Sequence, residues 1–216
     1  AANGLMGNVS AEAKTALLQA CNDEYRLVRI SAANSLAVFP KEQFTAQEKE
    51  LMAKAMEENL ASMTTRPDDW SSHYNLGIFY QNQNDANKAL ESYENAARLY
   101  PESLMPLINS SVLYSYIGNQ AKAEENLRKV IAIDPVNEAA NLNLGLLMAE
   151  QQKMDEAEKA LKITLQANPK QAVAAYNLSV ITASRSANEA VIYAKTAAEA
   201  APEEPRLHVA GGRAAV

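Results

Sequence analysis

Asparagine recurs along this chain at a constant spacing, at Asn75, Asn109, Asn143 and Asn177. An asparagine amide offers one acceptor and two donors, which match the C=O and N–H groups of an extended peptide backbone. A regular row of amides on one face therefore predicts a surface that holds an extended polypeptide with little sequence preference. The same amides could instead bond the backbone of a neighbouring helix, and the sequence leaves both interpretations open.

Other residues that carry chemistry are few. The chain has two histidines, His73 and His208, and one cysteine, Cys21. The sequence contains no Ser-His-Asp set, no metal-spaced His/Cys cluster and no phosphate-binding glycine loop. A single cysteine also excludes an internal disulfide and a CxxC site. We predict that the chain is not an enzyme and that it holds no metal and no cofactor.

The charge and hydropathy of the chain narrow the classes of partner that it could bind. The formal net charge is −6, and lysine and arginine are dispersed without a basic stripe, which argues against nucleic acid or anionic lipid. No apolar run approaches the roughly 18 residues of a membrane span, so we expect no membrane insertion. A protein or peptide ligand remains as the expected partner.

The elements that would position the asparagines recur with the same period. Pro101, Pro135 and Pro169 keep the spacing of the asparagines, and Pro202 comes one position earlier than that spacing would place it. A period between roughly 20 and 50 residues indicates stacked supersecondary units rather than one globular core. We predict an all-α fold, an α-solenoid of antiparallel helix pairs.

One unit illustrates the pattern. Apolar periodicity predicts a first helix over about 70–83 and a second over about 86–99, which Pro101 ends. Gly77 and Ala89 are small, so we expect the two helices to approach closely there. In the last unit the missing residue falls between the two helices, where a deletion is tolerated best.

The columns Leu76-Gly77, Tyr80, Ala89, Tyr93, Ala96 and Pro101 resemble the tetratricopeptide repeat, and three partly substituted copies follow them. The resemblance implies a right-handed superhelix over residues 67–204. It divides that region into four units, at 70–103, 104–137, 138–171 and 172–204. Residues 205–216 resemble a capping helix or a truncated fifth first helix.

The front of the chain has a different pattern. Residues 1–42 are predicted to form a helical pair, with helices to about Ala20 and from about Glu24 to Val38, the second capped by Asp23. Asp23 and the pair Val28-Arg29 resemble a HEAT repeat of the short bacterial type, in which these residues support the turn and the second helix.

A long connecting helix is predicted within residues 43–66. Thr45 and Glu48 have the spacing of a capping box at its start. We expect the helix to reach about Met63, with its core side formed by Met52, Met56, Leu60 and Met63.

The order of these modules resembles the C-terminal part of bacterial periplasmic multihaem c-type cytochromes. No CxxCH motif occurs, so this chain would bind no covalent haem itself. The resemblance implies a periplasmic location, with a cytoplasmic one as the alternative. It also implies a second hypothesis, in which the solenoid is a structural or oligomerisation appendage that self-associates or packs on the rest of a parent chain.

In tetratricopeptide stacks the first helix of each pair lines the concave face. The resemblance therefore implies a peptide-binding groove lined by Tyr74, Asn75, Ile78, Ile108, Asn109, Val112, Leu142, Asn143, Leu146, Tyr176 and Asn177. The repeats that grip carboxylate termini need lysines and an arginine on these helices. Here those columns hold Tyr74, Ile78, Ala139 and Asn143, so that class of partner is not expected.

Overall fold

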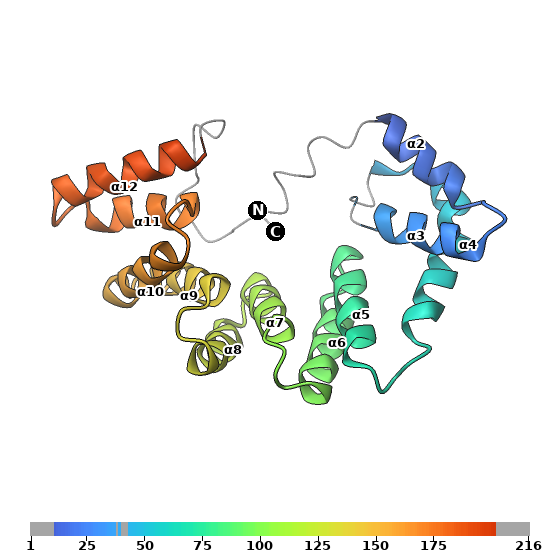
Figure 1. Cartoon of the computed structure of the whole chain (residues 1–216), viewed down its shortest axis with the longest axis horizontal. Helices are drawn as coiled ribbons and strands as arrows, with labels where there is room; N and C mark the ends of the chain where they lie inside the picture. Colours follow the sequence, from blue (N-terminus) through green and yellow to red (C-terminus); the bar gives the residue numbers. More distant parts are fainter. Residues whose placement is uncertain (1–10, 38, 40–42, 202–216) are drawn as a thin grey trace. The chain divides into compact units, whose positions relative to one another are not determined.

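The computed structural model describes residues 11–37, 39 and 43–201, and in this part of the chain it contains eleven α-helices and no strand (Figure 1). This confirms the predicted all-α class. The chain divides into two compact units, with the boundary after Pro106 near the start of α7. None of the described helices is both long enough and apolar enough to cross a membrane.

Unit 1 contains a helical pair, a long helix and the first repeat, and in it each helix packs on the next. Its helices are α2 (Ala11–Ala20), α3 (Arg26–Leu36), α4 (Ala46–Met63), α5 (Trp70–Asn82) and α6 (Ala86–Leu99). The core of its front part contains Leu18, Cys21, Ala33, Leu36 and Phe44, together with Met52 and Ala55 of α4.

Unit 2 contains the remaining repeats. Its helices are α7 (Met105–Tyr116), α8 (Gln120–Ile133), α9 (Glu138–Glu150), α10 (Met154–Ala167), α11 (Ala172–Thr182) and α12 (Ala187–Ala200). From α8 onward each helix packs on the next, and α9 also contacts α11. The amide of Asn126 on α8 donates to the hydroxyl of Ser110 on α7 at 3.0 Å. The first helices α9 and α11 therefore lie side by side, and α7 is joined to α8.

The predicted helix bounds of the first repeat are confirmed within a residue. Asp69 caps α5 through Ser71 N, and Asp85 caps α6 through Lys88 N. Each carboxylate satisfies a backbone donor that the first helical turn leaves without a partner.

A shared turn joins the two helices of three repeats. Asn84, Gly118 and Gln152 have positive φ angles of 57°, 83° and 62°, and they recur at the same spacing as the asparagine column. In each case the next residue donates its N–H to the carbonyl five positions back, as Asp85 does to Tyr80 at 2.9 Å. This left-handed residue closes the helix end. In the last repeat the equivalent residue is missing, so the deletion lies in the α11–α12 turn as predicted.

The second helix of the front pair is shorter than predicted. It begins at Arg26 and not Glu24, and its N-cap is Tyr25, which makes no side-chain cap bond. Asp23 Oδ1 accepts from Tyr25 N at 2.8 Å, so this carboxylate organises the turn before the helix rather than capping the helix itself. The predicted end at Val38 lies outside the described residues.

Arg29 supports that turn. Its guanidinium donates to the carbonyls of Asp23 at 2.8 Å and Glu24 at 3.0 Å. It also makes a two-point ion pair with Glu58 of α4, with both N–O distances 2.8 Å. One side chain thus joins the turn, α3 and α4.

The capping box at the start of α4 is confirmed, and so is the end of the helix at Met63. The core stripe is rotated from the predicted one, because Met52, Ala55 and Asn59 are buried whereas Met56 is half-buried. The other two predicted members, Leu60 and Met63, are also half-buried. The amide nitrogen of Asn59 finds no hydrogen-bond partner within the described residues.

The close helix contact predicted at Gly77 is confirmed. A Cβ placed on Gly77 would lie 2.4 Å from ring carbons of Tyr93 on α6, so the ring occupies the space that a side chain would need. Ala89, the other small residue of this pair, is fully buried. In unit 2, Gly145 meets Leu161 in the same way, at 2.6 Å.

Candidate peptide-binding surface

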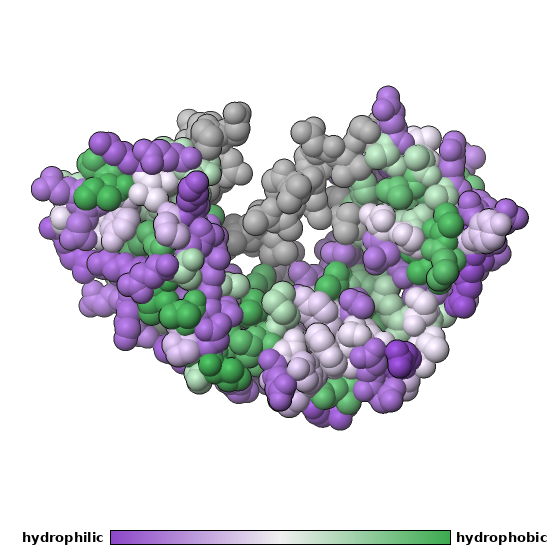
Figure 2. All heavy atoms as spheres, in the orientation of Figure 1, coloured by the Kyte–Doolittle hydropathy of each residue, from purple (hydrophilic) through white to green (hydrophobic). Residues whose placement is uncertain are grey.

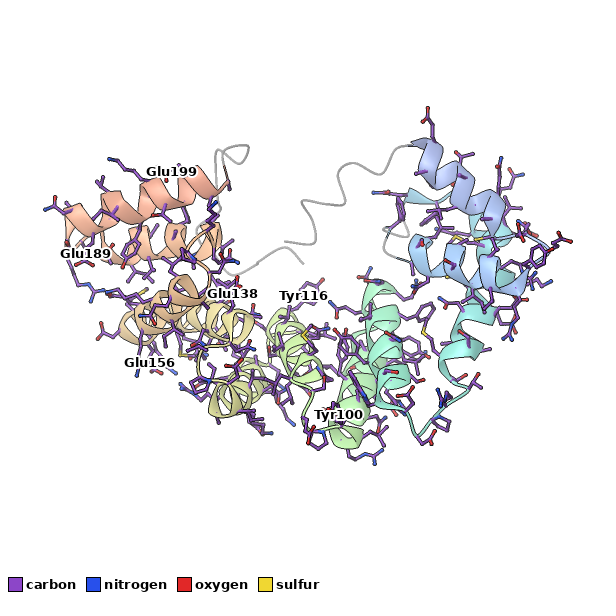
Figure 3. The ribbon with its side chains drawn as sticks, viewed as in Figure 1. Tyr100, Tyr116, Glu138, Glu156, Glu189 and Glu199 are labelled. Carbon is purple, nitrogen blue, oxygen red and sulfur yellow. The ribbon has the colours of Figure 1, made fainter. Side chains whose placement is uncertain are left out.

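The first helices and the second helices of unit 2 present different surfaces. Figure 3 shows Tyr116 and Glu138 on the side of the first helices, and Glu156 on the opposite side, where the second helices lie. On that opposite side Arg128 pairs with Glu124 and Glu156, each at 2.8 Å. The Arg128 guanidinium holds the pKa of the Glu156 carboxyl below its ordinary value. The second helices therefore present a polar surface whose charged side chains are held in ion pairs.

The first helices of unit 2 carry almost no charge. α7 and α11 contain no charged residue, and α9 contains only Glu138 and Glu150. None of the three helices has a lysine or arginine. A surface without cations cannot hold a carboxylate terminus by ion pairs, so the carboxylate-clamp mode lacks its residues here.

Apolar side chains of the predicted site occupy two columns in unit 2. In the first column Ile108 is buried, and Leu142 and Tyr176 are half-buried. In the second column the predicted residues Val112 and Leu146 are half-buried, and Val180, at the equivalent position of α11, is 43% exposed. Figure 2 shows hydrophobic side chains at the surface on the face in view. The second column is the more accessible, so it offers more apolar contact to a ligand.

The four asparagines have different environments. Asn177 is only 5% exposed, and its amide donates to the carbonyl of Val173 in its own helix at 2.8 Å. Asn109 and Asn143 are half-buried, and Asn75 is exposed. The Asn143 side chain makes no hydrogen bond to any other described residue. The column is therefore not uniform: the Asn177 amide is engaged within its own helix, whereas the amides of Asn143 in unit 2 and Asn75 in unit 1 remain for a ligand.

The part of the predicted site in unit 1 lies on α5. Ile78 is half-buried, and so is Tyr74, which belongs to an aromatic cluster. The Tyr74 ring lies 6.1 Å from Trp70 and 5.9 Å from Tyr93, measured between centroids. Such spacing is that of packed aromatic pairs. Tyr74 therefore contributes to the packing of unit 1.

Two residues on the same helix face were not predicted. Tyr116 is 70% exposed at the end of α7, and Glu150 is exposed at the end of α9. Each lies four positions after a predicted site residue, Val112 or Leu146, and i,i+4 residues share a helix face. Extending the columns by one turn would have found both. They add an aromatic ring and one carboxylate to the surface.

Glu138 is held in place at the start of α9. Its carboxylate accepts hydrogen bonds from Asn168 Nδ2 at 2.8 Å and Gln171 Nε2 at 3.1 Å. A carboxylate at a helix N-terminus is favoured by the helix dipole. These bonds tie α9 to the segment between α10 and α11, so they fix the position of one first helix relative to the next. No group of three or more metal-ligating side chains occurs among the described residues.

Sequence-family models identify the repeats. Residues 70–103 and residues 118–178 each match a tetratricopeptide repeat model. None of the curated proteins matches the chain. Tetratricopeptide repeat models therefore match one segment in each of the two units.

Solved structures confirm the solenoid fold. A crystal structure of MamA is 21% identical, with a TM-score of 0.61 over 74% of this chain and 96% of that one. YrrB, described as a TPR protein with an unusual peptide-binding site, is 20% identical, with a TM-score of 0.53 over 90% of this chain and 95% of that one. PilF of Pseudomonas aeruginosa is 20% identical, with a TM-score of 0.59 over 81% of this chain and 78% of that one. At these identities the likeness concerns the fold.

Proposed function

We propose that this chain, built from tetratricopeptide repeats, is a non-catalytic interaction scaffold that binds an extended polypeptide along the first helices of unit 2. The surface is formed by α7, α9 and α11. Its accessible members are Val112, Asn143, Leu146 and Val180, with Tyr116 and Glu150 at one edge. The observation that carries the proposal is the combination of apolar side chains and an available amide on helices without a single cation.

Each part of this surface suits a different part of an extended ligand. The apolar column would bury alternate side chains of the polypeptide, because successive side chains of an extended chain point to opposite sides. The Asn143 amide would bond a backbone carbonyl or N–H between them. Glu150 would favour a basic residue in the ligand at that edge over an acidic one. YrrB, a TPR protein that has a peptide-binding site and a similar fold, supports a ligand of this class.

A selection from a random peptide library tests this proposal. Wild-type protein and Leu146→Arg are each immobilised, since Leu146 is half-buried on the proposed surface. We expect wild type to enrich apolar peptides that Leu146→Arg does not retain. Lys159→Glu is the control, because Lys159 is an exposed residue of the second helix α10. Equal retention of the enriched peptides by Leu146→Arg would refute the proposed surface.

The alternative function, a structural or oligomerisation appendage, is favoured by one observation on α12. Its Val191 and Ile192 are 53% and 61% exposed, and Ala197 is the only buried residue of this helix. The second helix α10, in contrast, buries Ala157, Ala160, Leu161 and Thr164. If the chain is an oligomerisation appendage, it should self-associate at micromolar concentration, and Val191→Lys should abolish this self-association. Sedimentation of both proteins therefore distinguishes the two functions.

We also propose a periplasmic location, which rests on the resemblance in module order. Cell fractionation of the tagged protein in its native host tests it. Recovery with a cytoplasmic marker enzyme would contradict it.

A further inference from the structure

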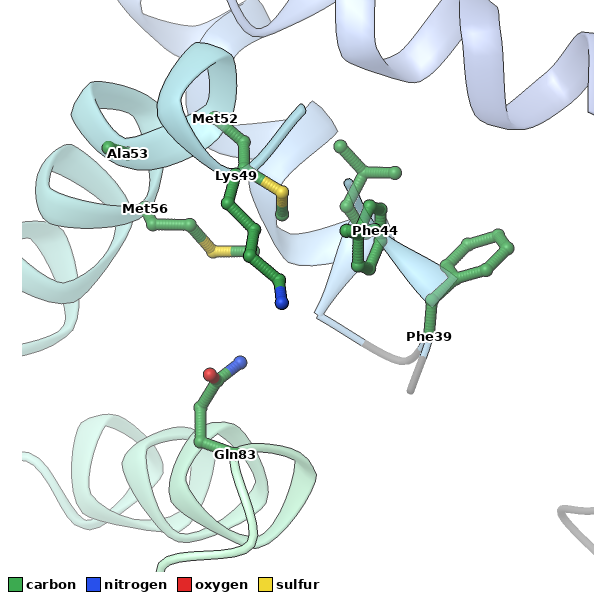
Figure 4. A pocket seen from close by; sticks show the side chains of 8 residues that line it. Phe39, Phe44, Lys49, Met52, Ala53, Met56 and Gln83 are labelled. Atoms are coloured by element: carbon green, nitrogen blue, oxygen red, sulfur yellow. The ribbon is translucent and has the colours of Figure 1, made fainter. Parts of the chain in front are cut away.

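Unit 1 contains an apolar cavity that the proposed polypeptide surface does not include. Its volume is about 240 Å³, and it lies between α4, the end of α3 and the α5–α6 turn (Figure 4). It is lined by Leu36, Phe39, Phe44, Lys49, Met52, Ala53, Met56 and Gln83. Six of these eight side chains are apolar.

The apolar wall of the cavity is partly fixed and partly adaptable. Leu36, Phe44 and Met52 belong to the buried core of unit 1. The rings of Phe39 and Phe44 pack edge to face at 6.1 Å between centroids. Methionine side chains are flexible and polarizable, so Met52 and Met56 can adjust to the outline of a bound group.

The two polar side chains lie on one side of this apolar wall. Figure 4 shows the Lys49 ammonium and the Gln83 amide facing each other across the opening. Lys49 is exposed, and it has no ion pair or hydrogen bond within the described part of the chain. The neighbouring carboxylate, Glu48, is already engaged, because it pairs with Lys14 at 3.0 Å and accepts from Thr45 N at 2.7 Å. The cavity therefore combines an apolar interior with an uncompensated positive charge at its opening.

We propose that this cavity binds a small amphipathic carboxylate, with the apolar body among Phe44, Met52 and Met56 and the carboxylate between Lys49 and Gln83. The Lys49 ammonium has three donors and can reach either carboxylate oxygen. The volume is below the roughly 300–1,000 Å³ of sites for drug-sized ligands, so the ligand is of fragment size. This site is independent of the polypeptide surface in unit 2.

Titration with octanoate tests the proposal in the full chain. The ¹³C-labelled methyl signals of Met52 and Met56 are observed by NMR, with each signal assigned from its Met→Leu variant. We expect saturable shifts of both signals with octanoate, and at least about tenfold weaker binding of octanol, as a lost charge-assisted hydrogen bond implies. Absence of shifts at Met52 and Met56, or equal binding of octanoate and octanol, would overturn the proposal.

Two pairs of variants distinguish binding in this cavity from non-specific binding elsewhere on the protein. Lys49→Met should weaken the binding of octanoate about tenfold and leave the binding of octanol unchanged. Lys54 is an exposed lysine of α4 outside the cavity, so Lys54→Met should change neither affinity. Ala53→Phe should fill the cavity and abolish binding, whereas Ala61→Phe on the same helix should not. Ala53 and Lys49 are both exposed, so these substitutions leave the buried core intact. Unchanged octanoate affinity in Lys49→Met or Ala53→Phe would also refute the site.

The same chemistry occurs in a free fatty acid and at a peptide C-terminus that ends in an apolar residue. An acetylated tripeptide ending in phenylalanine, with a free or amidated terminus, distinguishes these sources. Binding of octanoate and of the free-acid peptide, but not of the amide, would support the site and add peptide termini to its ligands. Binding of octanoate alone would support it for free acids.

Discussion

The turn residues at Asn84, Gly118 and Gln152 show how a single backbone conformation fixes the repeat. All three have positive φ, and only one is glycine. A non-glycine residue in the left-handed region costs roughly 1–2 kcal/mol, with asparagine the most tolerant. Gln152 is therefore the most strained of the three.

Gln152→Gly should raise the free energy of unfolding by about 1 kcal/mol, because glycine adopts φ of 62° without a steric penalty. Gln152 is exposed, so the change removes no buried contact. Gly118→Ala should lower the free energy of unfolding by a similar amount. Nothing lies within 4 Å of an added Cβ, so the cost comes from the φ of 83° alone. Urea denaturation measures both, and a destabilised Gln152→Gly would contradict this account of the turn.

Gly77→Ala should lower the free energy of unfolding by about 1–3 kcal/mol, the usual cost of overpacking a core. The added methyl group would meet the Tyr93 ring, which is buried and held by a hydrogen bond from its hydroxyl to Gln81 Oε1 at 2.7 Å. Moving the ring aside would therefore break this hydrogen bond and disturb the buried packing around Tyr93. In a Tyr93→Leu variant, Gly77→Ala should lower the free energy of unfolding by less. An equal loss in wild type and in Tyr93→Leu would show that contact with the ring does not cause the destabilisation.

At the scale of the element, the start of α4 depends on a reciprocal pair. Thr45 Oγ1 accepts from Glu48 N at 3.2 Å, and Glu48 Oε2 accepts from Thr45 N. The hydrogen bond from Thr45 N, together with Lys14, holds the pKa of Glu48 below its ordinary value of 4.5. Because the folded pKa is lower, the ionised carboxylate stabilises the folded state above pH 4.5, and this stabilisation is lost as the pH falls through the folded pKa.

Thr45→Ala should lower the free energy of unfolding by about 0.5–2 kcal/mol, the usual cost of removing an N-cap. Glu48→Gln should be destabilising at pH 7, and its difference from wild type should shrink as the pH falls below 4.5. Thermal unfolding followed from pH 7 to pH 3 measures the difference. A Glu48→Gln penalty that persists undiminished at pH 3 would exclude the carboxylate as its source.

The local elements could be predicted from sequence because their signals are local. The Thr45–Glu48 spacing, the periodic prolines and the small residue at Gly77 each specify a contact within one helix or one pair. The start of α3 could not be predicted as well, because Asp23 accepts from Tyr25 N in the turn rather than from an N–H of the helix. The core side of α4 depends on its neighbours, which periodicity alone does not give.

The candidate site could be predicted only in part. The i,i+4 columns identified the helix face, but not which amide along it is already engaged. Asn177 bonds the carbonyl of Val173, whereas Asn143, in the same column, bonds no described side chain or backbone group. The cavity beside Met52 and Met56 also left no pattern in the sequence, since its walls come from three separate segments: the end of α3 with the loop that follows it, α4, and the α5–α6 turn.

At the scale of the whole molecule, repeats of one kind are distributed over two compact units. The period of the repeat continues without interruption through Pro106, where the boundary between the units falls, so the sequence pattern gives no sign of it. The polypeptide surface proposed here lies within unit 2, and the carboxylate cavity lies within unit 1. Binding at one is therefore expected without binding at the other.

Site-specific photocross-linking to a selected peptide tests the central claim most directly. A photoreactive phenylalanine analogue is placed at Val180, which is 43% exposed on α11, or at the exposed outer position Lys159 on α10. We predict that the peptide is captured from position 180, that Asn143→Ala reduces this capture, and that position 159 captures none. Capture from position 159 with none from position 180 would contradict binding along the first helices.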